Sequence, residues 1–171
     1  MGKKNHYEAA FENFLRNSGI PYLSNRQEFR NPLEDGSSLK NFDFIVSDPH
    51  GSNWIVDVKG RLFPGGQNGR RFWKHWTTGE DLSGLLKWES YLGDRFRAVF
   101  VFAYLINGDR SPLPEDRLFL WKKRFYAFLA VPLHDYIAWA RLISPRWQTF
   151  EMPVRTFRDL ARPFDEFLRT A

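Results

Sequence analysis

The chain has 171 residues, no cysteine and a formal net charge of +5, with a pI near 9.6. Its length suits one domain over residues 1–171, and the lack of cysteine excludes disulfide frameworks and thiolate metal sites. Hydrophobic residues make up 43% and aromatic residues 18% of the chain, which argues against disorder.

No apolar run is long enough to span a bilayer, so we expect a cytoplasmic protein without a membrane partner. The basic balance is compatible with a polyanionic partner such as nucleic acid. None of the four histidines lies in a nucleophile setting, and paired zinc ligands are missing from the sequence. A Ser/His/Asp hydrolase and a zinc enzyme are therefore disfavoured.

Residues 6–18 carry apolar side chains at helical spacing, and Asn5 and Gly19 are the expected caps. Glu8 falls near the edge of the apolar stripe, so its carboxylate can point along the boundary of the core. An acid in the first turn also stabilises a helix without any further role, and this interpretation of Glu8 stays open.

A first strand is predicted within residues 20–30, and a hairpin follows after a loop over 31–40. The hairpin turns around His50, in a linker dense in turn-forming residues. If the loop is symmetric, Asp43 lies opposite Asp57 with the two Cβ atoms about 5 Å apart. Two carboxylates there repel each other unless a divalent cation lies between them.

The second strand of this hairpin, residues 53–61, carries an acid and a base two positions apart. Alternation sends Asp57 and Lys59 to one face of the strand and Val56 and Val58 to the other. Burying either charge alone is costly, so the pair requires mutual contact, a metal ion or a solvated cleft. A purely structural Asp–Lys ion pair is the alternative interpretation.

The stretch that follows mixes basic and aromatic residues and contains no acid before Glu80. Such a mixture suits phosphate contacts and base stacking, whereas a solvated loop with its aromatics in the core is the alternative. Its glycine-rich part, 64–69, lacks the Lys-Ser/Thr ending of a P-loop, so we reject a nucleoside triphosphatase. The candidate nucleic-acid-binding residues are Arg61, Arg70, Arg71, Trp73, Lys74 and, on the next helix, Lys87.

A capping box of Thr77 and Glu80 is predicted to open a helix that runs through Tyr91 and ends at Gly93. Residues 97–106 then form a continuous buried strand, as in an αβ unit.

The C-terminal part is predicted to contain a second hairpin over 117–132 and a short helix over 134–143. A terminal helix is expected over 156–168, with Thr156 and Asp159 as its capping box and a kink at Pro163.

The order of these elements resembles the PD-(D/E)XK nuclease superfamily, which includes restriction endonucleases and archaeal Holliday-junction resolvases. The resemblance covers about 6–106, with 107–171 as a C-terminal elaboration. It implies an α/β (α+β) fold in which helices flank a mixed central sheet, in the order α-β-β-β-α-β, followed by a hairpin and helices. Its carriers are Glu8 in HYEAAFENFL, Asp43 in NFDFIV, and Asp57 with Lys59 in IVDVKG.

The resemblance also implies a Mg²⁺-dependent nuclease that hydrolyses DNA, with Mn²⁺ able to substitute. Asp43, Asp57 and the backbone carbonyl of Val58 would hold the metal, and Glu8 would complete its shell directly or through water. Lys59 would orient the attacking water or offset charge in the transition state. The implied catalytic residues are thus Glu8, Asp43, Asp57 and Lys59.

Phe42 stands where the superfamily often has a proline before the second acid. Double-strand cutting by one site per chain often requires a dimer, so a homodimer is an open expectation. Two alternatives also stay open. One is a catalytically inactive nucleic-acid-binding module or assembly subunit on the same fold, and the other is an unrelated α/β interaction protein.

Overall fold

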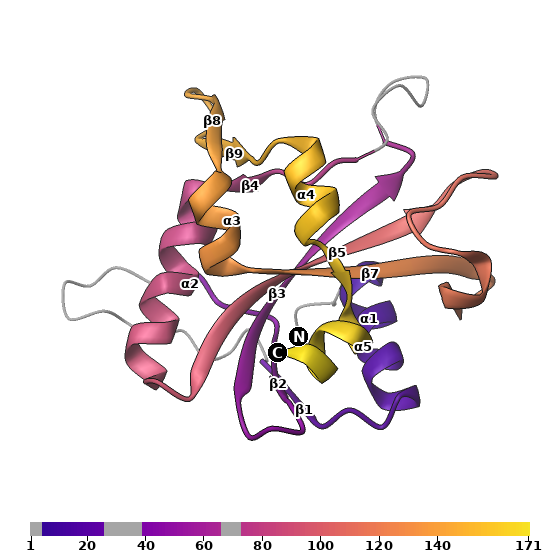
Figure 1. The fold of residues 1–171 in the computed structure, drawn as a ribbon, viewed down its shortest axis with the longest axis horizontal. Helices are drawn as coiled ribbons and strands as arrows, with labels where there is room; N and C mark the ends of the chain where they lie inside the picture. The colour runs from indigo at the N-terminus through magenta and orange to yellow at the C-terminus, as the bar shows by residue number, and fades with distance from the viewer. Residues whose placement is uncertain (1–4, 26–38, 66–72) are drawn as a thin grey trace.

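The computed structural model describes residues 5–25, 39–65 and 73–171. Within these ranges, seven strands form one mixed sheet and three short strands form a second (Figure 1). The large sheet contains, in spatial order, β1 (Tyr22–Ser24), β2 (Phe44–Ser47), β3 (Asn53–Phe63), β5 (Phe96–Ile106), β7 (Arg124–Pro132) and β10 (Arg162–Pro163), with β6 (Phe119–Trp121) also paired to β7.

The predicted hairpin is present, and its register is confirmed. Val46 lies opposite Trp54, and β2 and β3 are antiparallel. The turn between them is organised by Asp48, whose carboxylate accepts hydrogen bonds from the backbone N–H of His50 at 2.6 Å and of Ser52 at 3.2 Å. Gly51 adopts a φ of +89°, a left-handed conformation that glycine tolerates without strain.

The centre of the sheet is the parallel pair of β3 and β5, in register from Asn53 opposite Phe96 to Phe63 opposite Ile106. The helix α2 (Gly79–Leu92) precedes β5, as the αβ unit requires. Strands buried on both faces are typical of such parallel pairs, and residues 98–104 of β5 are all buried.

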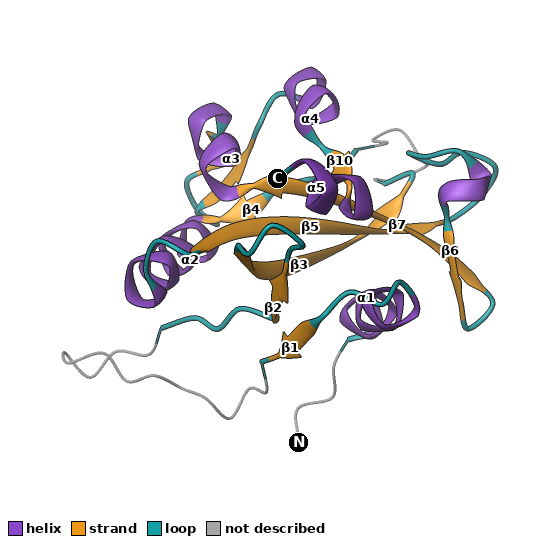
Figure 2. Cartoon of the chain, turned by 60° about the horizontal axis from the view of Figure 1, so that its bottom comes forward, coloured by secondary structure: helices purple, strands orange, loops and turns teal. Residues whose placement is uncertain are grey.

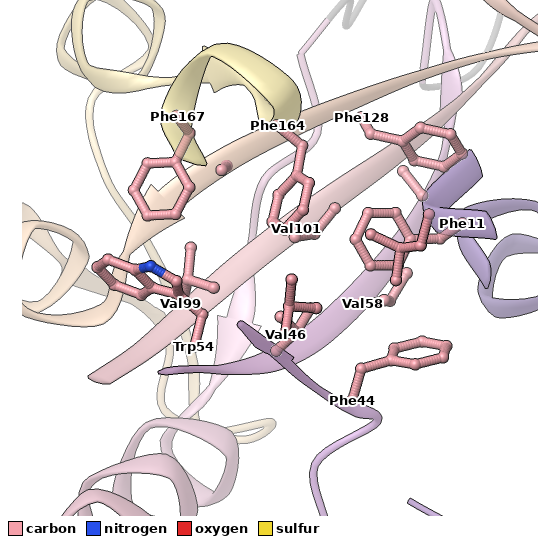
Figure 3. Packing of buried hydrophobic residues seen from close by; sticks show 14 of the residues in the cluster. Phe11, Phe44, Val46, Trp54, Val58, Val99, Val101, Phe128, Phe164 and Phe167 are labelled. Atoms are coloured by element: carbon pink, nitrogen blue, oxygen red, sulfur yellow. The ribbon is translucent and has the colours of Figure 1, made fainter. Parts of the chain in front are cut away.

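Helices cover both faces of the large sheet (Figure 2). On one face, α1 (His6–Asn17) and α5 (Phe164–Thr170) bury Phe11, Phe164 and Phe167 against β-strand residues such as Val99 (Figure 3). The other face is covered by α2, α3 (Leu133–Trp139) and α4 (Val154–Leu160).

The second predicted hairpin is also present, with β6 and β7 joined at Lys122 and Lys123. Both turn residues have positive φ, 47° and 61°, as a tight two-residue hairpin loop requires. A short 3₁₀ helix, η2 (Glu115–Arg117), precedes β6. Of the first predicted strand, the part near residue 22 forms β1, and its continuation over 27–30 lies outside the described residues.

Two C-terminal predictions are wrong. The helix expected over 134–143 ends at Trp139, because the chain then forms β8 (Arg141–Ser144), which pairs with β9 (Thr149–Glu151). β9 in turn pairs with β4 (Thr77–Thr78) to complete the small sheet.

The single helix expected over 156–168 is instead two helices, α4 and α5, separated by β10. α4 ends at Leu160, and Pro163, which has no N–H to continue a helical ladder, pairs in β10 and occupies the N-cap position of α5. Pro163 therefore lies between two helices and does not kink a single one. α4 begins at Val154 after Pro153, so Thr156 lies inside it and forms no capping box with Asp159. In the described part of the chain, no helix has the length and apolar character needed to cross a membrane.

Candidate active site

Asp57 and Lys59 project from the same face of β3 and contact each other. The Lys59 Nζ atom lies 2.9 Å from Asp57 Oδ2, and the two side chains are 13% and 11% exposed. Their neighbours Val56 and Val58 belong to the apolar cluster on the opposite face. The alternation predicted from the sequence therefore places an acid and a base together at a nearly buried position.

Asp43 lies directly before β2 and reaches across to β3. Its backbone N–H donates to the Val56 carbonyl at 2.9 Å, and its Oδ2 atom accepts from the Val58 N–H at 2.7 Å. The two bonds span the position of Asp57. Because N–H and C=O of one strand residue point to the same side, the Val58 carbonyl also faces the edge at which Asp43 lies.

The electrostatics of the two aspartates show that their charges are crowded. Burial raises the pKa of Asp43 well above its usual range, and the nearby carboxylates of Asp57 and Glu8 raise it further. Burial also raises the pKa of Asp57, against the opposing effect of Lys59. A cation between these groups would relieve both the desolvation and the repulsion.

Glu8 is brought to this region by α1. Asn5 caps the helix by accepting from the backbone N–H groups of Tyr7 and Glu8, and its side-chain amide donates to Glu8 Oε1 at 2.5 Å. The helix lies close to β3 at Gly60, where any Cβ would overlap the ring of Tyr7. A residue without a side chain after Lys59 thus permits the approach of Glu8.

Sequence reasoning missed Asp81, which lies at the centre of the ion-pair network. Its carboxylate is 2.9 Å from Lys59 Nζ and also contacts the ammonium of Lys40. The Thr77 hydroxyl and the Thr78 N–H donate to the same carboxylate, at 3.0 and 3.1 Å. Burial alone would raise the pKa of Asp81, but the lysines and these hydrogen bonds lower it well below the usual range.

Asp81 also corrects the predicted helix start. The capping box of α2 consists of Thr78 and Asp81, one residue later than the predicted Thr77 and Glu80. Both pairs have the required spacing, so the local pattern does not distinguish them. The pair of Thr78 and Asp81 places a carboxylate inside the protein, where it contacts the ammonium of Lys59, a residue remote in sequence.

The state of Lys59 follows from its two partners. Burial alone would lower its pKa, but Asp57 and Asp81 outweigh that effect and raise the net pKa above the usual value for lysine. Lys59 is therefore a fixed cation at neutral pH, suited to stabilising negative charge and unsuited to accepting a proton.

The other candidate residues occupy varied positions. Arg61 donates to the backbone carbonyls of Gly60 and Trp76, and its guanidinium lies 4.2 Å over the Trp76 ring. Trp73 packs edge-on against Phe63 and Tyr104, as the alternative for this stretch expected. The remaining candidates are the half-buried Lys74, the exposed Lys87 on α2, and Arg70 with Arg71, which lie outside the described residues.

The donor set suits a hard cation. Mg²⁺ binds proteins through one or two carboxylates and retains several waters, and Asp43, Asp57 and the Val58 carbonyl offer oxygen ligands of this kind. Glu8 influences Asp43 electrostatically from α1. In the parts of the chain that the structure describes, three or more acidic or histidine side chains do not gather into a complete metal site. Water would have to supply the rest of the shell.

A second polar site lies away from this cluster. Glu89 of α2 accepts from the Ala98 N–H at 2.6 Å and contacts His134 Nε2 at 2.7 Å. It borders a cavity of about 1,030 Å³ near Trp54 and Phe96, where β3 and β5 begin. This explains an acid on the apolar arc of α2 without assigning it to the Asp–Lys site.

No protein-family model matches the chain, and no curated protein matches its sequence. Among solved structures, the chain is similar to Hjc, a Holliday junction resolvase of the archaeal hyperthermophile Archaeoglobus fulgidus, with a TM-score of 0.56. The similarity covers 96% of this chain and 93% of that chain at 10% sequence identity. This likeness shows the fold alone, and it confirms the predicted mixed sheet flanked by helices, in a restriction-endonuclease-like arrangement.

Proposed function

We propose that this protein is a Mg²⁺-dependent nuclease that hydrolyses phosphodiester bonds in DNA. One observation carries the proposal: the carboxylate of Asp43, directly before β2, lies near Asp57 and Lys59 of β3 at one nearly buried position. Two like charges held together under desolvation are unfavourable unless they bind a cation. The similarity in fold to a Holliday junction resolvase supports DNA as the proposed substrate.

In this mechanism Asp43, Asp57 and the Val58 carbonyl would hold the cation, and Glu8 would act on it from α1, directly or through water. The bound ion supplies Lewis acidity to the phosphodiester and lowers the pKa of an attached water. Lys59, kept charged by Asp57 and Asp81, offsets negative charge that develops on the scissile phosphate. Asp81 acts on Lys59 and is a positioning residue.

The test is a cleavage assay with Mg²⁺ or Mn²⁺ on supercoiled, linear, single-stranded and branched DNA. We expect cleavage of at least one substrate by the wild type and none by Asp57→Asn, which keeps the shape of the side chain and removes its charge. Asp48→Asn is the matched control, because Asp48 as a whole residue is 7% exposed against 8% for Asp57, but organises a turn. Equal rates for Asp57→Asn and the wild type would end the proposal.

A second candidate is a nucleic-acid-binding module without catalysis. It is favoured by the ion pairs of Lys59 with Asp57 and Asp81, which neutralise part of the acidic charge internally. Calorimetry with Mn²⁺ separates the two functions. Binding that disappears in Asp57→Asn supports the nuclease, and no heat of binding in the wild type supports the module.

A further inference from the structure

The hairpin formed by β8 and β9 extends from the body of the protein beyond α3 (Figure 1). Its outer strand is an edge of the small sheet. Leu142 and Ile143 are neighbours on that strand, beside a β-bulge that leaves Ile143 unpaired, and both are 47% exposed. The outer strand of the hairpin therefore presents exposed apolar side chains to a partner.

One side of the hairpin borders a groove of about 450 Å³. Trp76 and Trp147 both line it, together with Ile143, Thr78 and Thr149. Trp147 is 67% exposed, which is unusual for the largest apolar side chain. The volume falls within the range of small-ligand sites, roughly 300–1,000 Å³.

An arginine guanidinium lies close to the indole ring of each of these two tryptophans. Arg146 lies 5.1 Å from the centre of the Trp147 ring, and Arg61 lies 4.2 Å from that of Trp76. Residues 141–150 contain two arginines and no acid. Aromatic surface bordered by cations suits a ligand that combines a flat ring with a negatively charged backbone, whereas an apolar peptide would not require the cations.

The groove adjoins the candidate active site. Thr78, which lines it, accepts from the Asp81 N–H at 3.1 Å, and the Asp81 carboxylate holds Lys59. Arg61, on the Trp76 ring, follows Lys59 by two positions and shares its face of β3. A strand whose phosphate lies at Lys59 could therefore continue into the groove.

We propose that this groove binds an unpaired nucleobase, stacked on Trp147 and Trp76, of the nucleic-acid strand that enters the active site. The inference rests on the proposed function and deepens it by naming the substrate class as DNA with unpaired nucleotides beside the scissile bond. Bases within a duplex are already stacked on one another, so they cannot offer their faces to the indoles.

The experiment measures binding in EDTA, so that cleavage plays no part. A fluorescein-labelled single strand and the duplex of the same sequence are titrated by anisotropy at fixed salt. We expect Trp147→Ala to weaken single-strand binding by roughly 5- to 50-fold and duplex binding by less than about twofold. Trp147→Phe, which keeps an aromatic face, should retain most of the affinity. Trp139→Ala is the matched control, since Trp139 is 51% exposed on α3 and does not line the groove.

Unchanged single-strand affinity in Trp147→Ala, or an equal loss for single strand and duplex, would overturn the inference. So would sedimentation showing that the wild type forms dimers that Trp147→Ala cannot form, because the occupant would then be a second copy of the chain. The inactive Asp57→Asn variant should bind the single strand through Trp147 as the wild type does. A negative result in the cleavage assay and a negative result in the single-strand binding assay can thus be distinguished.

Discussion

The two faces of β3 come from alternate residues of one strand, yet they differ in chemistry and in energetic role. One face presents Trp54, Val56 and Val58 to a cluster of phenylalanines under α1 and α5 (Figure 3). The other presents Asp57 and Lys59 to Asp43 and Asp81. Apolar burial stabilises the fold, whereas each buried charge is tolerated only through its partners. One face of β3 is therefore apolar throughout, whereas the other combines the buried Ile55 and Phe63 with the charged pair on which the proposed chemistry depends.

The largest effect should come from Lys59→Ala on the polar face. We expect the cleavage rate to fall at least a thousandfold, about 4 kcal/mol in the barrier, because among the described residues only Lys59 forms ion pairs with both Asp57 and Asp81. Nucleic-acid binding should remain largely intact. Single-turnover cleavage and anisotropy measure the two properties separately.

Lys40→Ala is the control for this variant. Lys40 also pairs with Asp81, but its side chain is 42% exposed, and it lowers the pKa of Asp57 less than Lys59 does. We expect its rate to fall less than about tenfold, the range of a surface ion pair. Equal losses of rate in the two variants would mean that Lys59 acts by pairing with Asp81 and does not stabilise charge on the scissile phosphate.

On the apolar face, Phe164→Ala should lower the free energy of unfolding by about 3 to 4 kcal/mol. Phe164 is 1% exposed, and its ring packs edge-on at 5.0 Å from that of Phe11. The folded fraction should cleave at the wild-type rate, because α5 contributes no side chain to the acidic site. Urea unfolding and cleavage below the unfolding transition test both statements.

The matched control is Phe125→Ala, since Phe125 is 41% exposed on β7. It should change stability by no more than about 0.5 kcal/mol. A loss of cleavage in folded Phe164→Ala would contradict the division of labour between the two faces.

Gly60→Ala tests how the faces are connected through α1. The new Cβ would overlap the Tyr7 ring, so that ring or the helix that carries it must shift, and we expect a loss of about 2 kcal/mol in stability. Adding Tyr7→Ala should recover part of that loss. Gly84→Ala is the control with the opposite sign, because its Cβ would meet Lys40 at an ordinary 3.5 Å and alanine favours a helix by up to about 1 kcal/mol. Thermal unfolding of the wild type and these three variants distinguishes these outcomes.

Local patterns carried much of this architecture. The symmetric turn around His50 predicted the pairing of Val46 with Trp54, and strict alternation predicted which face of β3 holds Asp57 and Lys59. Both signals depend on neighbours in sequence, and a register error of one residue would have exposed the whole apolar set.

Other features depend on contacts remote in sequence. Asp81 and Lys40 join the site only through tertiary ion pairs, and two overlapping capping patterns at Thr77 and Thr78 conceal the helix start. The hairpin of β8 and β9 is stabilised by pairing with β4, about 70 residues earlier. Because that pairing leaves no signal in the local sequence, the start of the hairpin is predicted as the continuation of a helix.

The smallest effect has a distinctive sign: Asp43→Asn should make the metal-free protein more stable at pH 7, by about 1 to 2 kcal/mol. The pKa of Asp43 is raised in the folded state by burial and by Asp57 and Glu8. Folding therefore favours the protonated carboxyl, and wild-type stability is lost as pH rises through that raised pKa. Asparagine resembles the protonated form and can still accept from the Val58 N–H.

Urea unfolding in EDTA, from pH 3 to pH 8, measures this difference between wild type and variant. The two proteins should be equally stable at the acidic end, where aspartate is protonated in both states, and should diverge as pH rises. Excess Mg²⁺ should then stabilise the wild type and leave Asp43→Asn unchanged, because a ligand stabilises only the state that binds it. A variant less stable than the wild type at neutral pH without metal would mean that Asp43 is a structural acid, and the polar face would lose its distinction from the apolar one.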